Sequence, residues 1–177
     1  DGIQYLIFCM SRLRVQSAES NIVFLSCATF QHRPIFRAFI VGELLLSVLT
    51  FYQRRGDYLL HTYCVMPDHY HLVLELKKVR SVSRILNNVH SAFVTTMEGK
   101  SNKHKQRYWS RHTWDVWIRS EEMYWQKVAY TLLNPWRAGL VKSPLDPYAF
   151  SNILEWRRKH GDEFMLDLFG RFGRRWK

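Results

Sequence analysis

This sequence has few cysteines, a shortage of acidic residues and no long apolar run. Its 177 residues include only Cys9, Cys27 and Cys64, and no two of them stand in a Cys-x-x-Cys pair. An odd number of separated cysteines argues against a disulfide framework and against a zinc knuckle. It fits a chain that works in a reducing compartment, so we expect a cytoplasmic protein.

The longest apolar stretch, residues 36–52, is interrupted by Arg37 and Glu43. It falls short of a bilayer crossing, so we expect a core helix there and no membrane span. A second apolar run, residues 3–10, follows an acidic residue and precedes Arg12 and Arg14, which is the reverse of a secretory signal. We leave residues 1–20 out of the fold as an N-terminal extension.

Acidic residues are scarce relative to basic ones. Asp and Glu number 15 against 26 Lys and Arg, which gives a formal net charge of +11. Such a charge attracts polyanions, of which nucleic acid is the commonest. The basic residues that we expect to contact DNA phosphates are Lys77, Lys78, Arg84, Lys103, Lys105, Arg107, Arg111 and Arg137. A basic surface with no dedicated partner is the alternative interpretation.

Hydrophobic periodicity predicts seven elements in one domain. Strands are predicted at 22–29, 58–66, 69–76 and 113–119, and helices at 36–52, 81–97 and 120–134. Ser81 and Ser120 are expected N-caps, and Pro135 is expected to end the third helix near Asn134. The order of elements predicts an α+β, ferredoxin-like (split βαβ) fold, an antiparallel sheet with helices packed on one face. We expect this domain to span 21–152. The basic, aromatic C-terminal segment 153–177 then either contacts DNA or docks on the domain.

Two histidines on a predicted strand, with a tyrosine and an asparagine on a predicted helix, are residue types that a metal-assisted nucleophilic reaction uses. His69 and His71 are two apart on a predicted strand, so their side chains leave the same face. Tyr130 and Asn134 are four apart on a predicted helix and share a face near its end. Two imidazoles and an amide oxygen leave open positions on a divalent ion, which can polarise a phosphate while a tyrosine attacks it. Taken separately, each residue also has a structural explanation. The two histidines fit half-exposed positions on an open sheet face, Tyr130 fits a core aromatic, and Asn134 fits a helix C-cap.

Two segments of the sequence together resemble one family. Tyr-Cys-Val-Met-Pro-Asp-His-Tyr-His-Leu-Val-Leu, residues 63–74, resembles the HUH segment of REP-associated tyrosine transposases, single-tyrosine HUH transposases of the IS200-like type. Tyr-Thr-Leu-Leu-Asn-Pro-Trp-Arg-Ala-Gly-Leu-Val, residues 130–141, resembles the nucleophile helix of that family and its continuation. The similarity runs from about residue 22 to residue 152. Tyr70 departs from the usual aliphatic residue between the two histidines.

This resemblance implies an HUH endonuclease fold and an enzymatic function. Tyr130 would be the catalytic nucleophile, and His69, His71 and Asn134 would bind a divalent metal, Mg²⁺ or Mn²⁺. The enzyme would cleave and rejoin single-stranded DNA with hairpin-type ends through a 5′-phosphotyrosine intermediate, as in DNA transposition. Some relatives place the tyrosine helix in a partner subunit and others act as monomers, so a homodimer and a monomer both remain expectations.

Three alternatives stay open. Tyr124 with Lys127 has the Tyr-x-x-Lys spacing of HUH replication initiators, but Val128, four residues after Tyr124, cannot bind metal. A catalytically silent nucleic-acid-binding domain with the same fold would keep the basic surface, although the aromatic signature of RNA-recognition motifs is absent. An unrelated metallohydrolase ranks last, because Val73 stands where a His-x-His-x-Asp site needs an acid.

Overall fold

The computed structural model describes residues 20–77, 81–99 and 106–173, and its centre is a four-stranded sheet. The strands are β1 (Ile22–Thr29), β2 (Tyr58–Val65), β3 (His69–Leu76) and β4 (Trp109–Trp117). They lie in the order β2-β3-β1-β4, and every neighbouring pair is antiparallel. A helix follows β1 and another follows β3, which is the ferredoxin-like arrangement. The predicted α+β fold class is confirmed.

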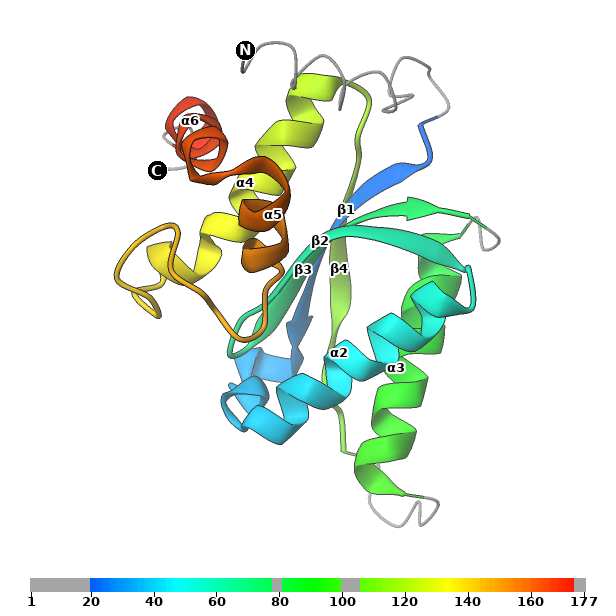
Figure 1. The fold of residues 1–177 in the computed structure, drawn as a ribbon. Helices are drawn as coiled ribbons and strands as arrows, with labels where there is room; N and C mark the ends of the chain where they lie inside the picture. Colours follow the sequence, from blue (N-terminus) through cyan, green and yellow to red (C-terminus); the bar gives the residue numbers. More distant parts are fainter. Residues whose placement is uncertain (1–19, 78–80, 100–105, 174–177) are drawn as a thin grey trace.

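Helices cover both faces of this sheet, as Figure 1 shows. On one face, called the α2–α3 face below, lie α2 (Phe39–Arg54) and α3 (Val82–Glu98). On the opposite face, the α4 face, lie α4 (Glu121–Arg137), α5 (Ile153–His160) and α6 (Asp162–Phe172). The expected packing on one face therefore holds for α2 and α3 and needs correction for α4. The physical reason is that the central strands are apolar on both faces, so Phe24 and Val73 need cover on the second.

A continuous apolar core lies under the α2–α3 face. Alternate residues of β1 and β3 point into it, and Leu72 and Leu74 of β3 are only 1% and 0% exposed. Helix α2 begins later than predicted because a short 3-10 turn, η2 (Ile35–Arg37), comes first and buries Phe36. Another short turn, η1 (Phe30–His32), directly follows β1. This core holds in place the sheet on which the α4 face is built.

Both predicted N-caps are confirmed. The Ser81 hydroxyl accepts a hydrogen bond from the backbone N–H of Arg84 at 3.3 Å, and that of Ser120 accepts from Met123 at 3.1 Å. Strand β4 begins at Trp109, before the predicted start at residue 113, because Trp109 pairs with Thr29 beyond a bulge. The long-range pairing thus extends the strand four residues before its predicted start.

The C-terminal end of α4 differs from the prediction. Pro135 lies inside the helix, which ends at Arg137 instead of Asn134. Proline disfavours helical geometry in the residue before it, but Pro135 is buried in the last turn with Leu132 and Leu133, and this packing outweighs the local preference. The chain then leaves the helix through Gly139, whose φ of 68° suits a residue without a Cβ.

The segment after residue 152 docks on α4. Trp156 of α5 and Met165, Leu168 and Phe169 of α6 are buried in one apolar cluster with residues of α4. Of the two roles expected for this segment, docking accounts for its described part. None of the helices within the described ranges is long and apolar enough to cross a membrane.

Residues 148–152 close the outer edge of β2. The Val65 N–H donates to the carbonyl of Phe150 at 2.8 Å. The Asn152 side-chain oxygen accepts from the Thr62 hydroxyl at 2.9 Å and from the Tyr63 N–H at 3.1 Å. Nearby, the Phe150 ring approaches α2 so closely that a Cβ added at Gly42 would lie 2.6 Å from it. Glycine at position 42 permits this contact.

Candidate active site

His71 points from β3 into the α4 face and is almost completely buried. Its exposed fraction is 2%, yet neither ring nitrogen has a hydrogen-bond partner among the described residues. Burial, followed by the nearby charges of His69 and Lys127, lowers the pKa of His71 to about 3. The imidazole is therefore neutral at physiological pH and keeps a lone pair. A buried polar side chain with no partner is what a metal ligand looks like before the metal is bound.

His69 lies beside His71 on the same face, as the strand alternation predicts. The two rings are 4.7 Å apart between centroids. His69 Nδ1 is hydrogen-bonded to Asp68 Oδ1 at 2.7 Å, and Asp68 Oδ2 is bonded to Nδ1 of His32 at 2.9 Å. Burial acts to raise the pKa of Asp68, but its two histidine partners outweigh that effect and lower it. A carboxylate on Nδ1 orients the ring and leaves Nε2 as the available ligand atom.

The backbone that brings His32 to Asp68 is strained. Gln31 and His32 have φ values of 54° and 52°, in the left-handed region that non-glycine residues rarely adopt. The Asp68 carboxylate on His32 helps to hold this conformation. Asp68 was not singled out in the sequence as a site residue, although an acid directly before a candidate metal-binding histidine is a usable signal.

Tyr130 comes from α4 and lies against the histidine pair. Its ring centroid is 5.2 Å from that of His71 and 5.7 Å from that of Phe24, both in edge-to-face geometry. Phe24 itself stacks on His71 at 5.6 Å and 18°. In the sheet register His71 pairs with Ser26, which on its other side pairs with Trp114. The structure thus brings together the tyrosine and the two histidines that the sequence had placed on separate elements.

Asn134 lies one turn after Tyr130 on α4. Its side-chain nitrogen donates to the backbone carbonyl of Tyr130 at 2.8 Å, which orients the amide and leaves its oxygen as the acceptor atom. The alternative role of Asn134 as a helix C-cap is wrong, because the C-cap is Ala138. No group of three or more His, Cys, Asp or Glu side chains in the described part of the chain could hold a metal ion. A three-ligand set therefore needs the amide oxygen, and metal binding stays a prediction.

Lys127 completes the surroundings of Tyr130. It is 5% exposed, and its Nζ lies 4.7, 4.8 and 5.8 Å from the ring centroids of Phe24, Trp114 and Tyr130. In the sequence, Lys127 stands out only for its spacing from Tyr124. Its position three residues before Tyr130, on the same helix face, was the signal that could have placed it in this site.

Tyr124, the alternative nucleophile, lies elsewhere along α4. It is 4% exposed, and its hydroxyl is hydrogen-bonded to Nδ1 of His61 at 2.8 Å. His61 in turn faces Glu75, with Nε2 3.5 Å from the carboxylate. Tyr124 therefore belongs to a separate buried cluster with a histidine of β2, whereas Tyr130 faces the histidine pair of β3.

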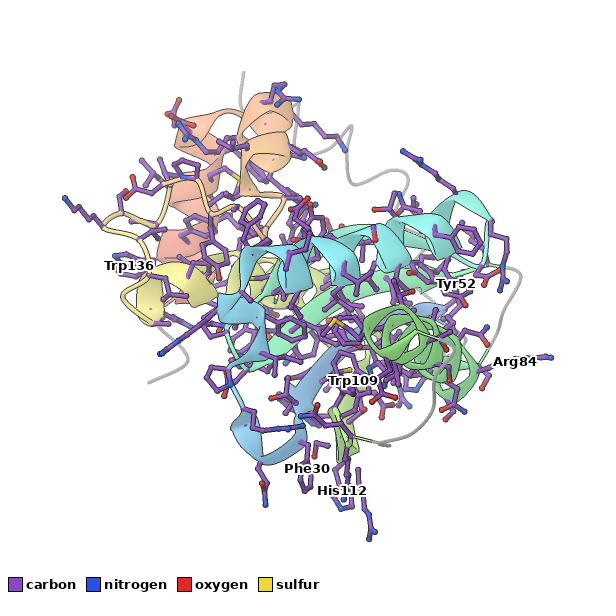
Figure 2. All side chains as sticks on the ribbon, turned by 90° about the horizontal axis from the view of Figure 1, so that it is seen from below. Phe30, Tyr52, Arg84, Trp109, His112 and Trp136 are labelled. Atoms are coloured by element: carbon purple, nitrogen blue, oxygen red, sulfur yellow. The ribbon has the colours of Figure 1, made fainter. Side chains whose placement is uncertain are left out.

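The residues predicted to contact DNA are spread over the molecule. Arg137 is the one nearest the tyrosine: its guanidinium lies 6.0 Å from the Tyr130 ring centroid and donates to the Gly173 carbonyl. Arg84 is on α3, and Figure 2 shows it at the opposite end of the molecule from Trp136, the neighbour of Arg137. Among the rest, Lys77, Arg107 and Arg111 are exposed, and Lys78, Lys103 and Lys105 lie outside the described residues.

Comparison with known proteins identifies the family. Residues 18–119 match the family model described as "Transposase IS200 like". This match covers more than half of the chain, so the protein belongs to the IS200-like transposase family, whose activity is DNA transposition. It includes both histidines of the pair and ends before Tyr130 and Asn134, so it does not test the roles predicted for them. Among curated proteins, none matches the chain.

The fold is also found among solved structures. A REP-associated tyrosine transposase bound to a REP hairpin has a TM-score of 0.63 and 20% identity, over 75% of this chain and 76% of that chain. A candidate transposase from Deinococcus radiodurans has a TM-score of 0.47 and 18% identity, over 64% of this chain and 90% of that chain. The first match confirms the predicted fold.

Proposed function

We propose that this protein cleaves and rejoins single-stranded DNA through a covalent bond between Tyr130 and a 5′ phosphate. The observation that carries the proposal is the contact between the Tyr130 ring and His71, at 5.2 Å, made by residues from α4 and β3. A phenol beside a neutral, buried imidazole with no hydrogen-bond partner among the described residues is a combination that a purely structural site does not need. Membership of a transposase family supports the same reaction class.

In the proposed reaction the Tyr130 oxygen attacks a DNA phosphorus atom. A bond forms between the phenolic oxygen and phosphorus, and the bond from phosphorus to O3′ breaks. The phenol proton passes to solvent, and the departing O3′ takes one up, so the strand ends in a free 3′ hydroxyl. The reverse attack by a 3′ hydroxyl rejoins DNA and frees the tyrosine. The phosphotyrosine preserves the bond energy, so no external energy source is required.

His69, His71 and Asn134 are the residues that would hold a divalent metal, Mg²⁺ or Mn²⁺. They fit such an ion in three respects: His71 keeps both nitrogens without a partner among the described residues, His69 is oriented by Asp68, and Asn134 has its amide nitrogen engaged so that the oxygen is available. When bound, the metal would supply Lewis-acid polarisation of the phosphate. The residues themselves orient the ligand atoms, and burial keeps the His71 imidazole neutral at the pH of the reaction.

DNA is the proposed partner because of charge and family. The +11 net charge favours a polyanion, and Arg137 places a guanidinium beside Tyr130. The similar tyrosine transposase is bound to a REP hairpin, which suggests hairpin-type DNA ends as the substrate to try first. Binding through such basic residues should weaken steeply as the salt concentration rises.

The experiment is covalent capture of DNA by the wild-type protein and by Tyr130→Phe. The protein is incubated with Mn²⁺ or Mg²⁺ and a pool of hairpin oligonucleotides with randomised single-stranded flanks, labelled at the 3′ or the 5′ end. A 5′-phosphotyrosine link predicts that only the 3′ label migrates with the denatured protein. Tyr130→Phe should form no adduct, since phenylalanine has no oxygen nucleophile.

Tyr124→Phe is the matched control. It removes the other hydroxyl of the helix, the one bonded to His61, and should still form the adduct. An adduct with Tyr130→Phe but none with Tyr124→Phe would reverse the assignment of the nucleophile. Tight, salt-sensitive DNA binding without any adduct would instead favour the alternative, a catalytically silent binding domain of the same fold.

A further inference from the structure

Lys127 is a buried cation among the aromatic rings of the candidate active site. Only 5% of the residue is exposed, although a lysine on a helix normally extends its ammonium into water. Here the ammonium is turned toward the sheet, with Nζ 4.7 Å from the centroid of Phe24 and 4.8 Å from that of Trp114. Its distance to the Tyr130 ring centroid is 5.8 Å. The cation therefore lies beside the proposed nucleophile.

Burial of the Lys127 ammonium costs hydration free energy. Burial lowers the pKa of Lys127, which records the loss of hydration around the ammonium. The faces of the aromatic rings recover part of that loss, because their π systems attract cations. An arriving phosphodiester would bring a full negative charge beside this partly dehydrated ammonium, and the two would interact more strongly than a pair of fully exposed charges.

Contacts on the α4 face place the histidine pair on β3 and the Lys127 ammonium toward β1 and β4. Phe24 on β1 contacts both groups: His71 on β3 stacks against it, and its ring centroid is 5.8 Å from that of Trp114 on β4, in edge-to-face geometry. Tyr130 contacts Phe24 and His71, and Lys127 contacts Phe24, Trp114 and, at 5.8 Å, the Tyr130 ring. A phosphate attacked by Tyr130 would therefore meet imidazoles toward β3 and an ammonium toward β4.

We propose that Lys127 is a catalytic residue whose ammonium binds a non-bridging oxygen of the phosphodiester attacked by Tyr130. The inference rests on the proposed function and adds to it the group that stabilises charge on the phosphate as the new bond forms. Among the described residues Arg137 also lies near Tyr130, with its guanidinium 6.0 Å from the ring, and it donates to the carbonyl of Gly173 at the end of α6. Lys127 is the deeper of the two, being buried where Arg137 is half-buried.

The test compares Lys127→Met, Lys127→Arg and a matched control, Lys142→Met, an exposed lysine after α4. Methionine keeps the unbranched apolar stem and should leave the fold intact, which urea unfolding checks. We expect Lys127→Met to slow adduct formation about 100-fold, the usual effect of removing one preorganised charge-stabilising group. DNA affinity should fall only about threefold, since one phosphate contact of several is lost. Lys127→Arg should recover part of the rate, and Lys142→Met should match wild type.

A second measurement separates contact with the phosphate from a structural role. After the cleaved linkage has been mapped, that single phosphate is replaced by a methylphosphonate, which exchanges one charged non-bridging oxygen for a methyl group. If Lys127 binds that charge, wild type and Lys127→Met should react with the neutral linkage at similar rates. A variant that merely disturbs α4 would be slower on both substrates, and that result would overturn the inference.

The outcomes also separate this inference from the proposed function. An adduct formed by Lys127→Met at the wild-type rate would reject the role of Lys127 and leave the tyrosine mechanism intact. If wild type forms no adduct, the proposed function fails. Metal-free binding of a single-stranded oligonucleotide then tests whether Lys127 binds a phosphate at all. Equal affinity of wild type and Lys127→Met would reject that site, whereas a loss confined to Lys127→Met, absent in Lys142→Met, would support it.

Discussion

Each face of the sheet holds a buried histidine, and the two histidines differ in their hydrogen-bond partners. On the α2–α3 face, His90 stacks on Trp109 at 3.9 Å, and its Nε2 is hydrogen-bonded to the Tyr70 hydroxyl at 2.8 Å. On the α4 face, His71 has no hydrogen-bond partner for either nitrogen among the described residues. Burial lowers the pKa of His90, and mainly burial that of His71, in each case to about 3, so both are neutral. The difference in partners, rather than in burial, distinguishes a structural histidine from one available for binding.

Replacing His71 with leucine should give the largest effect and tests the α4 face directly. Metal-dependent adduct formation should fall by about 1000-fold or more, since a bound metal contributes several kcal/mol to a phosphoryl transition state. The free energy of unfolding should stay the same or increase, because an imidazole without partners is replaced by an apolar side chain of similar size. Adduct assays and urea unfolding measure the two effects. A loss of more than about 2 kcal/mol of stability would show that His71 is structural after all.

Leu72→Ala probes the opposite face with the adjacent residue. Leu72 is 1% exposed in the apolar core of the α2–α3 face, so truncation should lower the free energy of unfolding by about 3 kcal/mol. Adduct formation per folded molecule should change little, since the side chain points away from Tyr130. Urea unfolding at 25 °C measures the stability. Equal stability losses in His71→Leu and Leu72→Ala would contradict the contrast between the two faces.

Asp68→Ala should give the smallest of the three effects. It removes the carboxylate that fixes Nδ1 of His69, and the loss of such an outer ligand contact typically weakens metal binding 10–100-fold. Titration of adduct formation with Mn²⁺ should show a higher half-saturating concentration and a similar final rate. His32→Ala is the control, because His32 contacts the same carboxylate from an exposed position. An unchanged Mn²⁺ requirement in Asp68→Ala would remove Asp68 from the site.

Much of this contrast could be predicted from local sequence rules. Strand alternation put His69 and His71 on one face and Leu72 on the other, and hydroxyl caps predicted the starts of α3 and α4. The helical spacing of Tyr130 and Asn134 also holds, since both lie on α4. These features depend on residues close in the chain, for which period and capping chemistry are sufficient.

The features that escaped prediction depend on long-range packing. Lysine is normally exposed, so nothing local indicates that Lys127 is buried between Phe24 and Trp114. Its burial follows from where α4 crosses the sheet. The same packing keeps Pro135 inside the helix, and pairing with Thr29 starts β4 at Trp109. In each case a contact between distant segments outweighs the preference of the local sequence.

The closure of β2 by residues 148–152 has a consequence for association between copies. A bare edge strand offers unpaired N–H and C=O groups on which another chain can assemble. At this edge the Val65 N–H bonds the Phe150 carbonyl, and the Asn152 side chain accepts from the Tyr63 N–H and donates to the His61 carbonyl. The backbone groups in this part of β2 are therefore already paired within the chain, and they are not available to a strand of a second molecule.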